Sequence, residues 1–147
     1  MNKLLIILAF GFWPWSSPPV EVVRAVSETV YPGRRETPVH TRYDILIVAG
    51  KSSKKLTVDG LYVKEQPCPV TLYSWPEKIK TSSFAKGDTL LVRAEWFEKR
   101  QIPPEEIQPS PPGVIRQYEV VLGFKVRKKR KYLPVKGITR KPDNIKL

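Results

Sequence analysis

Prolines limit this chain to extended structure over most of its length. Fifteen of the 147 residues are proline, and after residue 13 they recur so often that long helices are excluded almost everywhere. Proline lacks a backbone N–H, and its ring clashes with the preceding turn of a helix. Strands need only short uninterrupted runs, so they are the expected elements.

Apolar runs between the prolines indicate where the strands lie. The run Tyr43 to Ala49, YDILIVA, is nearly continuous and is typical of a central strand covered on both faces. The segment GDTLLVRAEWF follows a Gly-Asp turn and alternates, so that Leu90, Val92 and Ala94 share one face. Further strands are expected at Val20 to Val26, at Leu56 to Val63 with a hairpin turn or a bulge at Asp59-Gly60, at Val70 to Trp75 and at Gln117 to Lys128. One short helical turn is expected at Pro76 to Phe84.

The first 19 residues have the pattern of a signal peptide or a short membrane anchor. After Lys3, an apolar run extends from Leu4 to Trp13 and ends at Pro14. This run suits the apolar region of a signal peptide and is far shorter than the roughly 20 residues of a membrane-spanning helix. No A-x-A cleavage pattern follows, so a retained anchor stays open, with Trp13 and Trp15 suited to the headgroup layer. The other interpretation is a buried strand or helix of a cytoplasmic protein.

The chain length predicts one domain with an addition at each end. A content of 41% apolar residues can fill one modest core. We place this domain at residues 20–133, after the apolar segment 1–19 and before a basic, solvated tail at residues 134–147. The proline-rich stretch Gln101 to Gly113 is interpreted as a stiff surface loop.

Positive charge is concentrated near the C-terminus. The formal net charge is +12 at pH 7, and between Val121 and Leu147 ten cations face a single carboxylate, Asp143. Such a concentration indicates an anionic partner or a face that only needs solvation.

The last expected strand would align several of these cations. Its alternate apolar residues are committed to the core, so Lys125 and Arg127 must project from the opposite face. Lys129 and Lys131 would extend the same row if the strand continued. We call the predicted contact surface the C-terminal stripe, which consists of Lys125, Arg127, Lys128, Lys129, Arg130, Lys131 and Lys136.

No pattern in the sequence supports an enzyme. His40 is the only histidine and has no motif around it, so a surface or loop position is expected. The segment ILIVAGKSS ends like a phosphate-binding loop, but Ile45 stands where that motif requires glycine. Glu105 and Glu106 are adjacent and cannot face each other across a substrate. Cys68 is the only cysteine, so it forms no intramolecular disulfide and is expected as a small buried residue. We therefore expect no catalytic residue, no cofactor and no metal site.

The segments VEVVRAV, TRYDILIVAG, CPVTLYSW and FAKGDTLLVRAEW together resemble the layout of the five-stranded OB-fold barrel, and Lys86-Gly87-Asp88 forms the turn into the last of them. The layout is similar to that of OB-like modules beside membrane segments in DNA-uptake channels, over roughly residues 20 to 127. The resemblance implies a small barrel of about five to seven strands, in which cations follow a phosphate backbone and exposed rings stack on bases. The candidate stacking rings are Tyr73, Trp75, Phe97 and Tyr132.

An Ig-like sandwich is the alternative all-β architecture, and a structural or assembly role is the competing class of function. The stripe would then contact an acidic protein partner, an anionic membrane surface or a cell-surface polymer. Each Lys or Arg near anionic lipid contributes about 1 kcal/mol, so several together need no specific pocket. We expect a non-enzymatic binding or assembly module that is periplasmic, extracellular or membrane-associated, with single-stranded nucleic-acid binding as the alternative. The cluster VRKKRKY also fits a nuclear-import signal, which conflicts with the apolar N-terminus.

Overall fold

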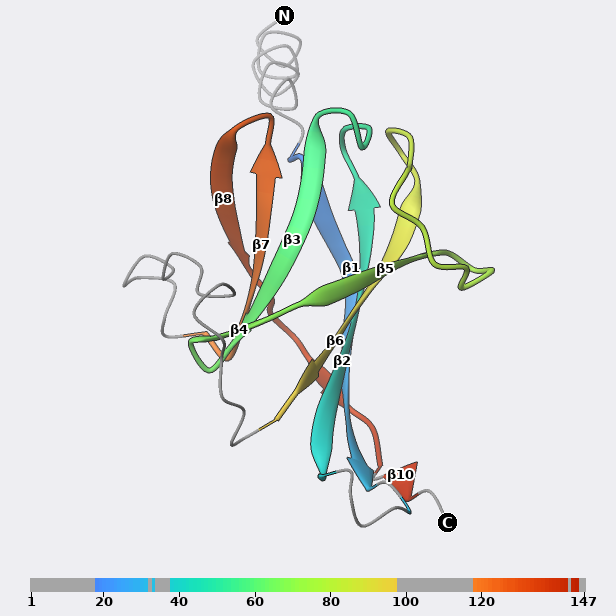
Figure 1. Cartoon of the computed structure of the whole chain (residues 1–147), viewed down its shortest axis with the longest axis vertical. Coiled ribbons are helices and arrows are strands. Elements are labelled where there is room, and N and C mark those ends of the chain that lie inside the picture. The colour runs from blue at the N-terminus through green and yellow to red at the C-terminus, as the bar shows by residue number, and fades with distance from the viewer. Residues whose placement is uncertain (1–17, 32, 34–37, 98–117, 143, 146–147) are drawn as a thin grey trace, which may run out of the picture.

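The computed structural model describes residues 18–31, 33, 38–97, 118–142 and 144–145 (Figure 1). The proposed signal or anchor, up to residue 17, and the proline-rich stretch Gln101 to Gly113 lie outside the described residues. Within the described ranges all regular structure is β, as expected. No helix in these ranges is long and apolar enough to cross a membrane.

The strands form two separate sheets (Figure 1). Sheet A has the order β10-β1-β2-β6-β5, with β9 also pairing with β1, and sheet B has the order β4-β3-β7-β8. Sheet A consists of β1 (Val20–Tyr31), β2 (His40–Ala49), β5 (Val70–Ser74), β6 (Thr89–Trp96), β9 (Thr139–Arg140) and β10 (Asn144–Ile145). Sheet B consists of β3 (Leu56–Val63), β4 (Gln66–Cys68), β7 (Val120–Val126) and β8 (Lys129–Pro134).

Both sheets contribute to one hydrophobic core. Ile45 and Ile47 from β2 are fully buried with Leu61 from β3 and Leu122 from β7. The loop Gly50–Lys55 carries the chain from sheet A to sheet B, so β2 and β3 do not pair. Among the described strands no hydrogen-bonded ladder joins the sheets, and the fold is not closed into a barrel. The barrel that the sequence favoured is therefore not formed.

Hydrophobic periodicity correctly predicted the central strands. β2 lies between β1 and β6, with Ile45 in the core and Leu46 buried on the opposite face. Leu90, Val92 and Ala94 of β6 all face the core, as their alternation predicted. A strand that is covered on both faces needs apolar residues at consecutive positions, which explains the continuous run in β2.

Of the two alternatives at Asp59-Gly60 the structure has the bulge, and the turn expected before β6 is present. In β3 the register against β7 shifts between Val58 and Gly60, so Asp59 is the extra residue of a bulge. Before β6, Gly87 has φ 92°, and the Asp88 carboxylate accepts a hydrogen bond from the Ala85 N–H at 2.8 Å. Glycine adopts this left-handed backbone without steric cost.

The helical turn predicted at Pro76 to Phe84 is wrong. The chain folds back along β5 instead, because its backbone groups bond to that strand. The Thr81 N–H donates to the Leu72 carbonyl at 3.0 Å, and the Ser74 N–H donates to the Ile79 carbonyl at 2.7 Å. One i to i−4 bond is present, from the Lys78 N–H to the Ser74 carbonyl at 2.8 Å, but it closes a single turn that does not continue as a helix.

The C-terminal segment is more ordered than the solvated tail predicted for residues 134–147. Val135 is buried in the core, and β9 and β10 both pair in parallel with β1. Arg140 of β9 also donates to the Glu119 carboxylate at 3.3 Å, which in turn accepts a bond from the Tyr43 hydroxyl at 3.4 Å. Burial, followed by the negative charge of Glu119, raises the pKa of Tyr43 to about 12. This part of the tail therefore belongs to the folded unit.

The first described residues, Pro18 and Pro19, contact the loop that connects the two sheets. The Gly50 N–H donates to the Pro19 carbonyl at 2.8 Å. A Cβ atom at Gly50 would collide with the Pro18 carbonyl oxygen and lie 3.1 Å from the Pro19 Cα. Only glycine allows this close approach, so Pro18 and Pro19 are anchored beside the loop.

We expect the substitution Gly50→Ala to lower the free energy of unfolding by about 1–3 kcal/mol, because the added methyl group forces the backbone of Pro18 away from the loop. Urea denaturation measures the effect. Ser52→Ala in the same loop is the control and should change little, since the loop uses the Ser52 backbone carbonyl to accept the Lys55 and Leu56 N–H groups. Equal stability of the two variants would contradict the close approach.

Candidate anion-binding surface

The strand that was predicted to carry the cationic row is shorter than expected. β7 ends at Val126, Arg127 and Lys128 form a two-residue turn, and β8 returns antiparallel from Lys129. Arg127 has φ 59°, in the left-handed region that two-residue hairpin turns favour. Its N–H donates to the Lys55 carbonyl at 2.6 Å. The single row predicted for the C-terminal stripe is therefore wrong, because the chain reverses in the middle of it.

The hairpin distributes the stripe over both faces of sheet B. Directly opposed residues of an antiparallel pair share a face. Lys125 lies opposite Arg130 on the outer face, whereas Lys131 lies opposite the core residue Phe124. Lys131 is nevertheless exposed, because β8 is an edge strand of the sheet. Cations at an edge strand also oppose unwanted pairing with other chains.

Arg130 is occupied by an internal carboxylate. Its two terminal nitrogens donate to the two Asp59 carboxylate oxygens at 2.7 and 3.2 Å. Both side chains are largely buried, with exposed fractions of 18% and 20%. Burial opposes the charge on Arg130, but the hydrogen bonds with Asp59 and its negative charge together outweigh burial and raise the pKa of the guanidinium. Arg130 thus stabilises the fold and is not available as a contact cation.

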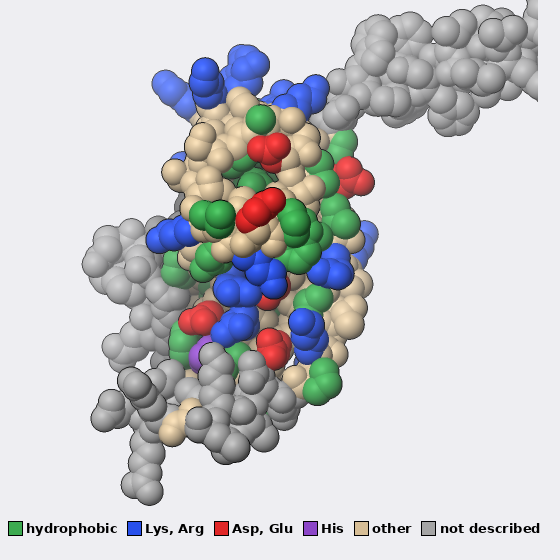
Figure 2. Space-filling view, turned by 90° about the vertical axis from the view of Figure 1, so that its right-hand side faces the viewer, with side chains coloured by type: hydrophobic (Ala, Val, Ile, Leu, Met, Phe, Trp, Pro, Cys, Tyr) green, Lys and Arg blue, Asp and Glu red, His purple; other side chains and the backbone are tan. Residues whose placement is uncertain are grey.

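The remaining cations of the turn join others from two distant loops. The loop Gly50–Lys55 lies beside the turn Ala85–Asp88, since the Ser53 N–H donates to the Phe84 carbonyl at 3.0 Å. It also contacts the Arg127 turn through the bond described above. All three loops lie at the upper end of the domain, where Lys and Arg side chains gather (Figures 1 and 2). We call the cations of these loops and of the adjoining first residue of β8 the basic end: Lys51, Lys54, Lys55, Lys86, Arg127, Lys128 and Lys129.

The basic end has little negative charge of its own. The only carboxylate in its three loops is Asp88, and a bond from the Ala85 N–H occupies one oxygen of it. None of its seven cations forms an ion pair with a described carboxylate. All of them are exposed except Lys51, which is half-buried. The end is thus a surface of uncompensated positive charge.

Sequence reasoning found only part of this surface. Arg127, Lys128 and Lys129 were predicted, whereas the cations of KSSKK at residues 51–55 and Lys86 were missed. One feature of the sequence could have indicated them: the lysines at residues 51–55 follow one expected strand, and Lys86 precedes another. Their meeting with the Arg127 turn depends on the pairing of strands far apart in the sequence.

Lys136 of the predicted stripe lies apart from the basic end. It follows β8, at the end of that strand opposite to the Arg127 turn. Its ammonium group lies 5.5 Å from the ring centroid of Tyr118, which precedes β7. Lys136 is therefore unsuited to join the same contact.

The four candidate stacking rings do not line one surface. Tyr73 and Phe97 line a hollow of about 480 Å³ on the outer face of sheet A. Arg93 shares this hollow, with its guanidinium carbon 5.4 Å from the Tyr73 ring centroid. Trp75, which follows β5, contacts two cations, whereas Tyr132 lies on sheet B. No cation of the basic end lines the hollow, so rings and basic end are separate features.

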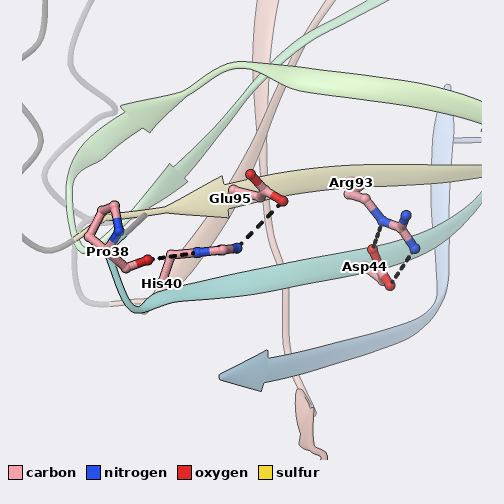
Figure 3. A network of polar contacts seen from close by, with 5 residues as sticks. All are labelled: Pro38, His40, Asp44, Arg93 and Glu95. Atoms are coloured by element: carbon pink, nitrogen blue, oxygen red, sulfur yellow. Dashed lines mark hydrogen bonds and ion pairs between the residues drawn. The ribbon is translucent and has the colours of Figure 1, made fainter. Parts of the chain in front are cut away.

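On the outer face of sheet A, Arg93 is paired with a carboxylate (Figure 3). Arg93 of β6 donates from Nε to Asp44 Oδ1 at 2.8 Å and from Nη2 to Asp44 Oδ2 at 3.2 Å. The hydrogen bonds to Asp44 raise the pKa of Arg93. The two side chains are directly opposed on neighbouring strands, where opposite charges stabilise the pairing.

His40 is buried, which contradicts the surface or loop position expected for it. It begins β2, its Nδ1–H donates to the Pro38 carbonyl at 3.2 Å, and its Nε2 lies 3.5 Å from the Glu95 carboxylate (Figure 3). Its ring packs against Phe97 with centroids 4.8 Å apart. These contacts give His40 a structural role at the start of the strand.

Cys68 is buried in the core, as expected. In the part of the chain that the structure describes, no three His, Cys, Asp or Glu residues lie close enough together to hold a metal ion.

Comparisons with known proteins returned no match, whether to family models, to curated proteins or to solved structures. The resemblance to OB-like modules stays a prediction.

We expect Asp59→Asn to destabilise the protein by about 1–3 kcal/mol, because it leaves the largely buried guanidinium of Arg130 without a countercharge. Thermal or urea unfolding measures the loss. Glu77→Gln removes an exposed carboxylate for comparison and should change stability by less than about 0.5 kcal/mol. An Asp59→Asn variant as stable as Glu77→Gln would show that Arg130 does not depend on Asp59.

Proposed function

We propose that the protein is a non-enzymatic binding or assembly module that docks on an anionic partner through its basic end. The observation that carries the proposal is that three loops and the start of β8 bring seven cations to one end of the domain, while these loops carry a single carboxylate. The fold serves as a rigid support on which these loops are held. For the architecture, we propose that the two sheets form a β-sandwich around their shared core.

The concentration of cations without a described carboxylate partner on three adjacent loops supports a contact surface over a merely solvated face. Elsewhere on the domain three arginines have carboxylate partners: Arg93 pairs with Asp44, Arg130 with Asp59 and Arg140 with Glu119. The basic end lacks such partners among the described carboxylates. Clustered cations repel one another, and an anionic partner relieves this repulsion.

The proposed location is a membrane surface or an exported compartment. The apolar run Leu4 to Trp13 supports this location, because its length and composition suit a signal peptide or a short anchor. An acidic protein, an anionic membrane and a cell-surface polymer all present the charge that the basic end would meet.

A charge variant with a matched control tests the proposal. In the test variant, Lys54, Lys86 and Lys128, one exposed residue from each loop, are changed to Gln. We expect its affinity for heparin, used as a polyanion probe, to fall about tenfold, since each exposed charge contact contributes roughly 0.5 kcal/mol. Titration at two salt concentrations should also show a shallower salt dependence.

The matched control changes the same number of exposed lysines elsewhere. Lys80, Lys136 and Lys141 lie outside the basic end, and their change to Gln gives the same net charge as the test variant. We expect the control to bind heparin with an affinity close to that of the natural chain. Equal losses in the two variants would mean that only net charge matters, and the proposed surface would be wrong.

Single-stranded nucleic acid is the second candidate partner, and the hollow lined by Tyr73, Arg93 and Phe97 is the observation that favours it. Stacking of a base on an aromatic ring contributes about 1–3 kcal/mol. If docking is electrostatic, as we propose, Tyr73→Leu should leave oligonucleotide affinity unchanged, as should Tyr31→Leu at an exposed tyrosine elsewhere. A loss of about tenfold or more for Tyr73→Leu alone would favour the second candidate.

A further inference from the structure

We infer that the partner of the basic end is the anionic lipid surface of the membrane that takes up the apolar N-terminal segment. This inference rests on the proposed function and names the partner class. It requires the domain to meet the membrane with the Gly50–Lys55 loop, the Ala85–Asp88 turn and the Arg127 turn foremost.

The start of the described chain places the apolar segment at this end of the domain. The Pro19 carbonyl accepts the Gly50 N–H at 2.8 Å, and Gly50 directly precedes Lys51 of the basic end. Trp13, the last residue of the apolar run, is five residues before Pro18. Five residues span at most about 18 Å, so the covalent chain keeps the apolar run close to the basic end.

The chemistry of the basic end fits lipid headgroups better than a nucleic-acid strand. Its three loops read GKSSKK, AKGD and RK, and contain no aromatic residue on which a base could stack. The hollow that contains the half-buried rings of Tyr73 and Phe97 is lined by none of the seven cations. Cations spread over several loop tips suit an extended anionic surface, which attracts each Lys or Arg without needing a pocket.

Two weak membrane signals on one end would reinforce each other. An apolar segment too short to span a bilayer holds a protein only marginally, and stable attachment commonly needs a second signal such as a basic patch. Here the covalent chain fixes the distance between the two signals, so binding of one raises the local concentration of the other at the same surface.

Orientation on vesicles tests the inference with the full chain. An environment-sensitive dye is attached at one of two positions. K86C lies in the basic end, whereas V39C lies at an exposed position just before β2, and the opposite end of β2 leads into the Gly50–Lys55 loop. Cys68 is 2% exposed and should not react in the folded protein. The vesicles are phosphatidylcholine, either alone or with about 30 mol% phosphatidylserine.

We expect the dye at residue 86 to report a headgroup environment only on vesicles that contain phosphatidylserine, and the dye at residue 39 to report water on both. In unlabelled protein, changing Lys54, Lys86 and Lys128 to Gln should lower partition onto the anionic vesicles by a factor on the order of 100. The matched variant at Lys80, Lys136 and Lys141 should partition almost as the natural chain does.

The outcomes separate this inference from the proposed function. If the charge variant loses heparin binding but the dye at residue 86 stays in water on anionic vesicles, the lipid surface is wrong and the binding module stands. An equal dye response on neutral vesicles would likewise overturn the inference, because the apolar segment alone would explain it. If the charge variant keeps its affinity for heparin, both proposals fall.

Discussion

The backbone hydrogen bonds of the loop Gly50–Lys55 determine how the upper end of this domain is built. This loop crosses from sheet A to sheet B, and its groups bond to the Pro19 carbonyl, the Phe84 carbonyl and the Arg127 N–H. A loop between packed sheets must satisfy its polar backbone groups, and here neighbouring chain segments supply the partners. The same bonds that complete the fold therefore bring cations from three parts of the sequence together.

Burial explains why Arg130 is paired with a carboxylate while the lysines of the basic end have no such partner among the described residues. Arg130 and Asp59 are each about one fifth exposed, so an isolated charge at either position would be costly to desolvate. The lysines at the loop tips remain in water, where an unpaired charge has little cost. A folded domain can thus carry a strongly positive end while a largely buried cation such as Arg130 is matched by a carboxylate, and the exposed charge can attract an anionic surface.

Much of the strand pattern was predictable because local periodicity encodes it. The alternation in β6, the continuous apolar run in β2 and the bulge at Asp59 were all expected from short windows of sequence. The turn at Arg127-Lys128 was not, because neither residue is a Gly, Asn, Asp or Pro that normally indicates a turn. The pairing of β9 and β10 with β1 was missed for a related reason, since two-residue strands are too short to show a period.

The sequence by itself determined three properties: that the described part of the chain is all-β, which strand residues face the core, and that the protein carries a large excess of positive charge. Composition and short-range alternation suffice for each of these. Only the tertiary structure decided which cations share a surface. Lys54, Lys86 and Lys128 are separated by more than thirty residues from one another in the chain, and strand pairing and the loop between the sheets bring them to one end. The same long-range contacts match Arg130 with Asp59 and remove it from that surface, which no local pattern in the sequence could reveal.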